Sequence, residues 1–210
     1  MNKIRFKIMK YAKMLNSKNL SALRSGNISI RYKDGFFITP SGKKYLSLKK
    51  SDIVFVNLDG TFDKKKGTPS SEWKFHQDIY LNKVEANAIV HSHSTNATAV
   101  STHKKGIPAF HYMVAMAGGS DIKCAKYATF GTRALSKNII IALKNRNACL
   151  ISNHGQIAFE ENISKAFELA EEVENISLQY ITSLKLGKPK ILSSKEMKKV
   201  LSKAKNYKKG

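Results

Sequence analysis

Two histidines one residue apart, His91 and His93, have the type and spacing of metal ligands. They follow the run Ala88-Ile89-Val90, which is typical of a buried strand. Because successive side chains of a strand point to opposite faces, residues two apart share a face. We therefore predict that both imidazoles point the same way and hold one metal ion. Two unrelated surface histidines are the alternative, and further ligands from the rest of the chain must decide.

A third imidazole and a carboxylate complete a candidate ligand set. His154 follows an apolar stretch, 148–152, that predicts a second buried strand, and Gly155 lets the backbone turn close to a ligand. Glu72 lies in the first turn of a predicted helix, where an interaction with the helix dipole, worth about 0.3–1 kcal/mol, is the alternative to metal binding. Three neutral imidazoles leave the full charge on Zn²⁺, which favours a reaction that develops negative charge on substrate oxygens.

Two serines at the start of the same helix predict an anion site. Ser70 and Ser71 stand just before the helical pattern, where hydroxyl groups cap the first backbone N–H groups. Capping alone would explain them, but a helix N-terminus with two hydroxyls is also suited to bind phosphate. Both roles stay open at this point.

The elements around these residues mix strands and helices. Gly26 and Asn27 mark a turn before a strand at 28–32, and the turn at 33–35 leads into a return strand at 36–38. A further strand is predicted at 52–58, and helices at 3–18, 95–102, 132–144, 163–186 and 193–205. The helix after Glu72 is predicted to present one face made of Trp73, Gln77, Tyr80, Leu81 and Val84. The pattern predicts a single α/β domain over residues 1–210.

Composition sets the class of protein. The chain has 210 residues, of which 42% are hydrophobic and 25% charged, and this is ordinary for one soluble domain. Its two cysteines cannot form a disulfide framework and are typical of small core residues. No apolar run approaches the ~20 residues of a membrane span, and a secretion signal is missing. We therefore expect a cytoplasmic protein with no membrane partner.

The formal net charge of +22 favours anionic partners, such as phosphorylated metabolites or nucleic acid. Most of the excess is lysine spread along the chain, whereas arginine grips phosphates and guanines better. Lysines on solvated faces are therefore the simpler interpretation, and nucleic acid is not an expected partner.

Eight stretches of the chain carry a resemblance to known proteins, and they are 26–29, 38–42, 69–73, 91–93, 107–113, 127–133, 142–146 and 154–155. On these stretches the chain resembles the class II aldolase and adducin head family, from the first helix to the tail with almost no gaps. The elements 26–27, 70–72 and 91–93 belong to the whole family, whereas 107–113 and 127–133 are narrower and favour the branch that acts on fuculose 1-phosphate.

The resemblance implies a central, mostly antiparallel sheet flanked by helices. It also implies a homotetramer around a fourfold axis, with active sites at the subunit interfaces. One Zn²⁺ per chain, or another divalent metal, would be held by His91, His93, His154 and Glu72. A phosphate would be cradled by small residues with hydroxyl, amide and backbone N–H donors, namely Gly26, Asn27, Ser41, Gly42, Ser70 and Ser71.

The activity implied by the resemblance is reversible cleavage of L-fuculose 1-phosphate, or a similar ketose 1-phosphate, to dihydroxyacetone phosphate and L-lactaldehyde. Zn²⁺ would stabilise the ene-diolate, and Glu72 would return a proton to it. Tyr112 from a neighbouring chain would manage the proton on the aldehyde oxygen, if a positive charge moderates its usual pKa of about 10. Tyr207 would close over the site, and Phe130 would line the aldehyde pocket.

Two other functions stay open. A sibling enzyme of the same fold, such as a ribulose-phosphate 4-epimerase, a rhamnulose-phosphate aldolase or a methylthioribulose-phosphate dehydratase, would share the metal and phosphate sites. A basic binding module that has lost the chemistry is the other, and the intact ligand set argues against it. Arg24 replaces a threonine of the fuculose-phosphate branch, so it either adds a charged phosphate contact or points to solvent.

Overall fold

A β-hairpin starts the sheet of this protein. The computed structural model describes residues 1–207, with side chains through residue 204, and in it β1 (Asn27–Tyr32) pairs antiparallel with β2 (Gly35–Ile38). The turn between them is the predicted one, with Lys33 at a φ of 50° in the left-handed region. β3 (Val54–Asn57) pairs with β2 and closes this end of the sheet.

The hairpin belongs to one mixed sheet. Within the described chain, seven strands lie in the order β3-β2-β1-β4-β7-β6-β5, and every neighbouring pair is antiparallel except β5 with β6. This confirms the mostly antiparallel sheet that the resemblance implied. The remaining strands are β4 (Ala88–Ser92), β5 (Cys124–Ala125), β6 (Ala148–Ile151) and β7 (Gly155–Glu160).

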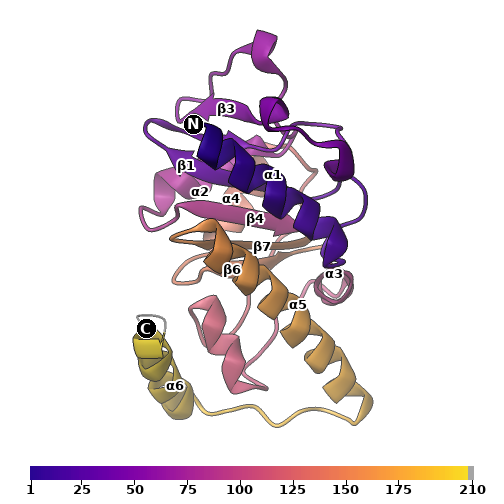
Figure 1. Cartoon of the computed structure of the whole chain (residues 1–210). Helices are drawn as coiled ribbons and strands as arrows, with labels where there is room; N and C mark the ends of the chain where they lie inside the picture. The colour runs from indigo at the N-terminus through magenta and orange to yellow at the C-terminus, as the bar shows by residue number, and fades with distance from the viewer. Residues whose placement is uncertain (208–210) are drawn as a thin grey trace.

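Helices cover both faces of the sheet (Figure 1). On one face, Ile8 and Phe167 form a core with Val90, and on the other face Phe75 packs in a second core with Ile89. Adjacent strand residues thus serve opposite cores, as the alternation of a strand requires. The first face is covered by α1 (Asn2–Ser17) and α5 (Ile163–Lys185), the second by α2 (Trp73–Asn82) and α4 (Arg133–Ala142), and α3 (Thr95–Thr102) and α6 (Ser194–Tyr207) complete the helices.

The pairing of β1 with β4 positions the residues of interest. Asn27 lies opposite His91 and Ser29 lies opposite Ile89, so all four side chains share the face that α2 and α4 cover. Glu72 lies immediately before α2 and is buried beside this face. A strand pair and the start of a helix therefore converge at one place.

Two strands, β5 and β7, were not predicted from the sequence. β7 lies between β4 and β6, and its residues Ile157, Ala158 and Phe159 are fully buried. Helices cover both faces of this strand, so its apolar residues form a continuous run instead of the alternation that marks a half-exposed strand. β5 has only two residues and is too short to give a pattern.

The predicted face of α2 was wrong in part. Leu81 is 58% exposed and Val84 is 87% exposed, and the helix ends before Val84. Gln77 and Tyr80 are buried as members of that face, and the full set of buried side chains is Phe75, His76, Gln77, Ile79 and Tyr80.

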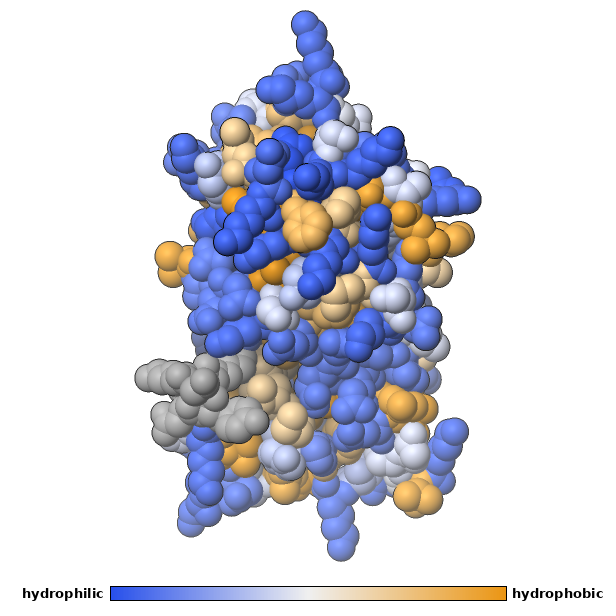
Figure 2. All heavy atoms as spheres, in the orientation of Figure 1, coloured by the Kyte–Doolittle hydropathy of each residue, from blue (hydrophilic) through white to orange (hydrophobic). Residues whose placement is uncertain are grey.

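Hydrophilic residues cover most of the face seen in Figure 2, with hydrophobic ones scattered among them. None of the described helices is both long and apolar enough to cross a membrane. The two cysteines are unpaired, and Cys149 is buried while Cys124 is half-buried. Burial raises the pKa of both thiols, as expected for packing residues.

A carboxylate from α5 caps the helix that follows β4. Oε1 of Glu174 accepts hydrogen bonds from the backbone N and from Nδ2 of Asn96, at 2.8 and 2.7 Å, and Oε2 accepts one from N of Ala97 at 2.9 Å. The backbone amides belong to the first turn of α3 and have no partner inside the helix. Glu174 satisfies them with a negative charge that the helix dipole favours.

We predict that Glu174→Ala lowers the free energy of unfolding by about 1.5–3 kcal/mol, because hydrogen bonds to a charged group are lost. Glu171→Ala is a matched control on the same helix. The carboxylate of Glu171 forms an exposed ion pair with Lys18 at 3.5 Å, so its loss should cost less than about 1 kcal/mol. Urea denaturation measures both values, and equal losses would contradict the capping role.

Candidate functional site

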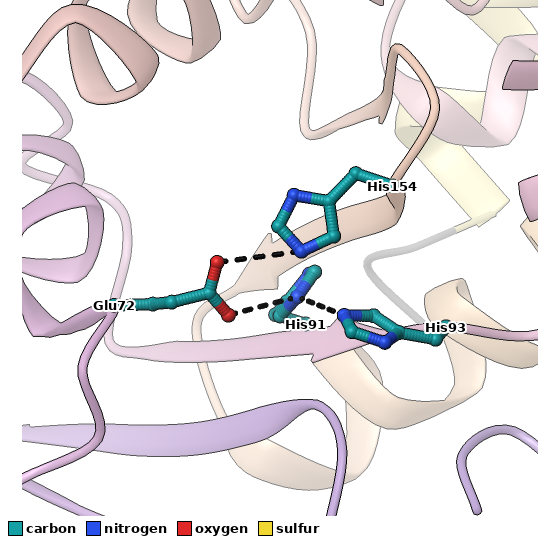
Figure 3. Close-up of side chains that lie close together, drawn as sticks. All are labelled: Glu72, His91, His93 and His154. Atoms are coloured by element: carbon teal, nitrogen blue, oxygen red, sulfur yellow. Dashed lines mark hydrogen bonds and ion pairs between the residues drawn. The ribbon is translucent and has the colours of Figure 1, made fainter. Parts of the chain in front are cut away.

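Four side chains from three separate segments meet beside the sheet. One ligand atom from each of Glu72, His91, His93 and His154 lies within 4.8 Å of the others (Figure 3). The structure therefore brings all four predicted metal ligands together. We call this group the metal cluster.

The three imidazoles form an equilateral triangle. The ring centroids of His91, His93 and His154 are each 4.8 Å from the other two. His93 was predicted to lie on one face of the strand with His91. β4 ends at Ser92, so His93 lies just past the end of the strand. Glu72 is the N-cap residue of α2 and not part of its first turn, and it approaches the triangle from the side.

Hydrogen bonding shows which ring atom of His91 faces the cluster. Nδ1 donates to the backbone oxygen of Gln156 at 2.7 Å, so Nε2 of the neutral ring carries a lone pair. That atom lies 3.2 Å from Oε2 of Glu72 and 3.0 Å from Nε2 of His93. Two acceptor atoms this close repel one another unless a cation or a proton lies between them. The arrangement therefore fits a bound cation, with Gln156 orienting the ring.

The second carboxylate oxygen of Glu72 supports the same conclusion. Oε1 is buried, has no hydrogen-bond partner among the described residues, and lies 3.3 Å from Nε2 of His154. An unsatisfied buried polar atom costs about 1–3 kcal/mol, and more when it is charged. A cation held by the cluster would offset that cost. Three imidazoles and a carboxylate suit Zn²⁺, although other first-row divalent metals accept the same donors.

The pKa values of the cluster leave its ligands ready to bind a metal. Burial raises the pKa of Glu72, but the imidazoles of His91 and His154 and the amide of Asn27 outweigh burial and lower it to about 2. Burial and the neighbouring imidazoles lower the pKa of His93 to about 3 and that of His154 to about 4. At neutral pH the carboxylate is ionised and these two rings are neutral, which is the state that metal binding requires.

A pocket of about 350 Å³ opens beside the metal cluster. A bridge between Pro40 and Pro69 joins the loop after β2 to the segment before α2, which brings two predicted phosphate-binding segments side by side. The lining of the pocket contains every residue that was predicted to hold phosphate or to line the aldehyde pocket, namely Gly26, Asn27, Ser41, Gly42, Ser70, Ser71 and Phe130. It also contains three residues of the metal cluster, Glu72, His93 and His154, and further residues that include Arg24, Tyr127 and Asn153.

The pocket needs small residues because backbones approach closely there. Gly26 has a φ of +74°, and a Cβ on it would lie 2.6 Å from the backbone oxygen of His91. Both serines line the pocket at the start of α2. Oγ of Ser70 accepts a hydrogen bond from N of Glu72 at 3.3 Å, but Glu72 is the N-cap residue, so this bond forms before the first turn of the helix, while Ser71 is exposed at the pocket.

As far as the chain is described, the pocket lining does not include either of the two tyrosines that were predicted to be catalytic. Tyr112 begins a 3₁₀ helix, η4 (Tyr112–Ala117), is 55% exposed, and does not belong to the pocket lining. Tyr207 is the last residue of α6, and its side chain lies outside the described residues. The catalytic roles of both tyrosines therefore remain predictions.

Some pocket residues were missed or left undecided. Tyr127 and Asn153 line the pocket although no role was predicted for either. Tyr127 opens one of the stretches that carried the family resemblance, and Asn153 directly precedes His154 and Gly155, so both had a signal in the sequence. Arg24 reaches over the pocket, where Nη1 donates to the backbone oxygen of Gly42 at 3.0 Å.

Known proteins resemble this chain in both sequence and fold. A family model described as Class II Aldolase and Adducin N-terminal domain matches residues 6–181. The L-fuculose phosphate aldolase of Escherichia coli (strain K12) is 46% identical over 207 residues, covering 98% of this chain and 96% of the relative. The 5-methylthioribulose-1-phosphate/5-deoxyribulose-1-phosphate aldolase of Rhodospirillum rubrum is 42% identical over 204 residues, covering 97% and 92%. A solved L-fuculose 1-phosphate aldolase superposes with a TM-score of 0.93 at 36% identity, covering 97% and 96%.

The neutral histidines predict a pH-dependent stability for the metal-free protein. Unfolded histidines take up protons below about pH 6.5, whereas folded His154 stays neutral down to about 4 and His93 down to about 3. The unfolded state therefore binds more protons in this window. Stability is lost as the pH falls from about 6.5 towards 4, by up to about 1.4 kcal/mol per pH unit for each histidine.

Urea denaturation of chelator-treated protein across this pH window measures the slope. His154→Ala should make the slope shallower by about one proton, because one neutral ring is removed from the folded state. A free energy of unfolding that does not change between these pH limits would contradict the burial of neutral rings.

Proposed function

The chain belongs to the class II aldolase and adducin N-terminal domain family, and on that basis we propose that this lyase cleaves L-fuculose 1-phosphate reversibly to dihydroxyacetone phosphate and L-lactaldehyde. One observation carries the proposal: Glu72, His93 and His154 of the metal cluster also line the pocket whose other residues suit a phosphate. A ketose 1-phosphate carries its phosphate one carbon from its carbonyl group. One substrate molecule can therefore occupy the pocket and reach the cluster.

Small polar groups and one cation suit the phosphate. Serine hydroxyls, the amide of Asn27 and backbone N–H groups beside glycines are donors for phosphate oxygens. Arg24 is the only lysine or arginine among the described residues that line the pocket, and its guanidinium is anchored on Gly42. We assign Arg24 a charged contact with the phosphate, which is one of the two roles that the sequence left open.

A divalent cation in the metal cluster would neutralise the negative charge that moves onto the substrate oxygens when the bond between C3 and C4 breaks. Glu72 is the proton carrier at C3. Its Oε2 accepts a hydrogen bond from Nδ2 of Asn27 at 3.0 Å, whereas Oε1 has no hydrogen-bond partner in the described chain. Oε1 is therefore the atom that removes the proton from C3 in synthesis. In cleavage the ionised Oε1 first takes up a proton, equivalent to the one that leaves the C4 hydroxyl, and then gives it to C3.

A second proton-handling group is required, because the C4 hydroxyl loses its proton as C3 gains one. Tyr112 suits this role by its chemistry, but it lies outside the pocket of its own chain and is 55% exposed. We propose that it acts in the pocket of a neighbouring copy within a homotetramer, and that Tyr207 closes over the same site. The metal of choice is Zn²⁺, given the three imidazoles.

A second substrate class is supported by the Rhodospirillum rubrum relative, which is named for 5-methylthioribulose 1-phosphate and 5-deoxyribulose 1-phosphate. These esters share the phosphate and carbonyl of the fuculose ester and differ in the aldehyde that leaves. Phe130 lines the pocket and is 64% exposed. An apolar contact of this kind discriminates weakly, since one methylene group is worth only about 1–3 kcal/mol. An assay with both kinds of ketose 1-phosphate is therefore needed to identify the aldehyde that leaves.

We predict that the metal-loaded protein releases dihydroxyacetone phosphate from L-fuculose 1-phosphate, that chelation abolishes the release, and that Zn²⁺ restores it. Glu72→Gln should lower kcat by about 10²–10⁴-fold, because the proton carrier is lost. A coupled assay of dihydroxyacetone phosphate measures both effects. Turnover of 5-deoxyribulose 1-phosphate alone would assign the second substrate class, and no release from any ketose 1-phosphate would refute the aldolase function.

Arg24→Gln should weaken inhibition by inorganic phosphate and raise KM for the sugar phosphate by about tenfold, since a charged contact of about 1.4 kcal/mol is lost. The value of kcat should change little. Lys43→Gln is the matched control from the neighbouring loop, because Lys43 pairs with Asp52 at 2.5 Å and does not line the pocket. Equal inhibition constants for Arg24→Gln and the unmodified protein would exclude the phosphate contact.

A further inference from the structure

We infer that His76, acting through Asn27, is a positioning residue that aims the carboxylate of Glu72, and its kinetic consequence rests on the proposed function. His76 belongs to neither the metal cluster nor the pocket lining. It lies in the middle of a row of five hydrogen-bonded side chains that ends at Glu72. We call this row the buried relay.

The buried relay is continuous. The hydroxyl of Tyr80 lies 2.7 Å from Oγ of Ser29, which lies 2.7 Å from Nδ1 of His76. On the other side of the ring, Nε2 of His76 makes a short hydrogen bond with Oδ1 of Asn27. Nδ2 of Asn27 then donates to Oε2 of Glu72 at 3.0 Å.

The spacing of residues along α2 matches the spacing along β1, which explains why the relay has no gap. Glu72, His76 and Tyr80 are four residues apart at and within α2, which corresponds to a rise of about 6 Å per step. Asn27 and Ser29 are two residues apart on one face of β1, which corresponds to about 6.6 Å. Because the two steps are nearly equal, helix and strand side chains alternate along the relay without a gap.

Burial makes each link necessary. The exposed fraction is 0% for Ser29 and His76, 2% for Asn27 and Tyr80, and 6% for Glu72. Bulk water does not reach such positions, so a polar atom that loses its partner stays unsatisfied. Each side chain of the relay therefore holds the next one in a single orientation.

The charge of Glu72 sets the direction of every hydrogen bond. An ionised carboxylate only accepts, so Asn27 must turn its Nδ2 towards Glu72 and its Oδ1 towards His76. His76 must then donate from Nε2. Burial lowers the pKa of His76 to about 3, so the ring is neutral and its Nδ1 accepts from Ser29. The oxygen of Ser29 in turn accepts from Tyr80.

The relay creates a difference between the two oxygens of Glu72. Oε2 is tied to Asn27, while Oε1 is left without a hydrogen-bond partner in the described chain. Without the N–H of His76, the Asn27 amide is free to turn over and present its oxygen to Oε2. That contact is repulsive, and the carboxylate would leave the orientation in which Oε1 faces the cluster.

Two substitutions of His76 separate positioning from packing. In His76→Gln, the side-chain amide nitrogen can occupy the place of Nε2 and still donate to Asn27. In His76→Asn, the shorter side chain reaches only the place of Nδ1 and supplies a partner for Ser29 alone. Loss of a partner behind a metal ligand typically costs 10–100-fold, so we expect about that loss of kcat for the Asn variant and a much smaller one for the Gln variant.

Steady-state kinetics and thermal melting of both variants test the positioning role. KM should change less than kcat in each, because Arg24 and the serines keep their places in the pocket. A packing role would lower kcat alike in the two variants, in step with their melting temperatures, and that result would overturn the inference. A raised KM with an unchanged kcat would also overturn the inference.

The tautomer of His76 provides a test that does not depend on catalysis. Long-range ¹H–¹⁵N spectra of the zinc-loaded protein should show His76 protonated at Nε2 and not at Nδ1 near neutral pH. Protonation at Nδ1 would overturn the direction of the relay. If the expected tautomer is seen in a protein that releases no dihydroxyacetone phosphate, the proposed function fails while the relay stands.

Discussion

The alignment of α2 with the β1–β4 pair is the constraint on which the site depends. Asn27 lies opposite His91 across the two strands, and Glu72 at the start of the helix meets both. A shift of one residue in β1 would send Asn27 to the opposite face of the sheet. Glu72 would then lose its hydrogen bond from Asn27, and the buried relay would be broken. The site is thus a product of strand register and not a set of residues added to an independent surface.

The two halves of the site have opposite electrostatic needs. The metal cluster presents imidazole lone pairs and a carboxylate, which together require a cation. The adjoining pocket presents hydroxyls, amides and the guanidinium of Arg24, which together require an anion. A phosphorylated sugar bound next to a divalent cation meets both needs. The net charge of +22 adds a long-range field that attracts anionic substrates to the molecule.

The parts of the site that could be predicted from sequence are those that follow local rules. His91, His93 and His154 lie at the ends of apolar strands, and each is recognisable without knowing the fold. His76 could not be recognised, because a single histidine on a helix has no pattern, and its partners come from β1, more than 40 residues away. β7 was missed for a related reason: burial on both faces removes the alternation on which strand prediction depends.

The attachment of α6 has a consequence for how the molecule comes apart. This helix packs on η4 through a small cluster of Ala109, Ala115 and Met197, and a backbone hydrogen bond from Leu192 to Ala109 tethers the segment before it. Few apolar contacts mean a low free energy of local opening. Amide hydrogens of α6 will therefore exchange with solvent before those of α5, and proteases will cut the exposed segment 186–191 while the sheet stays folded.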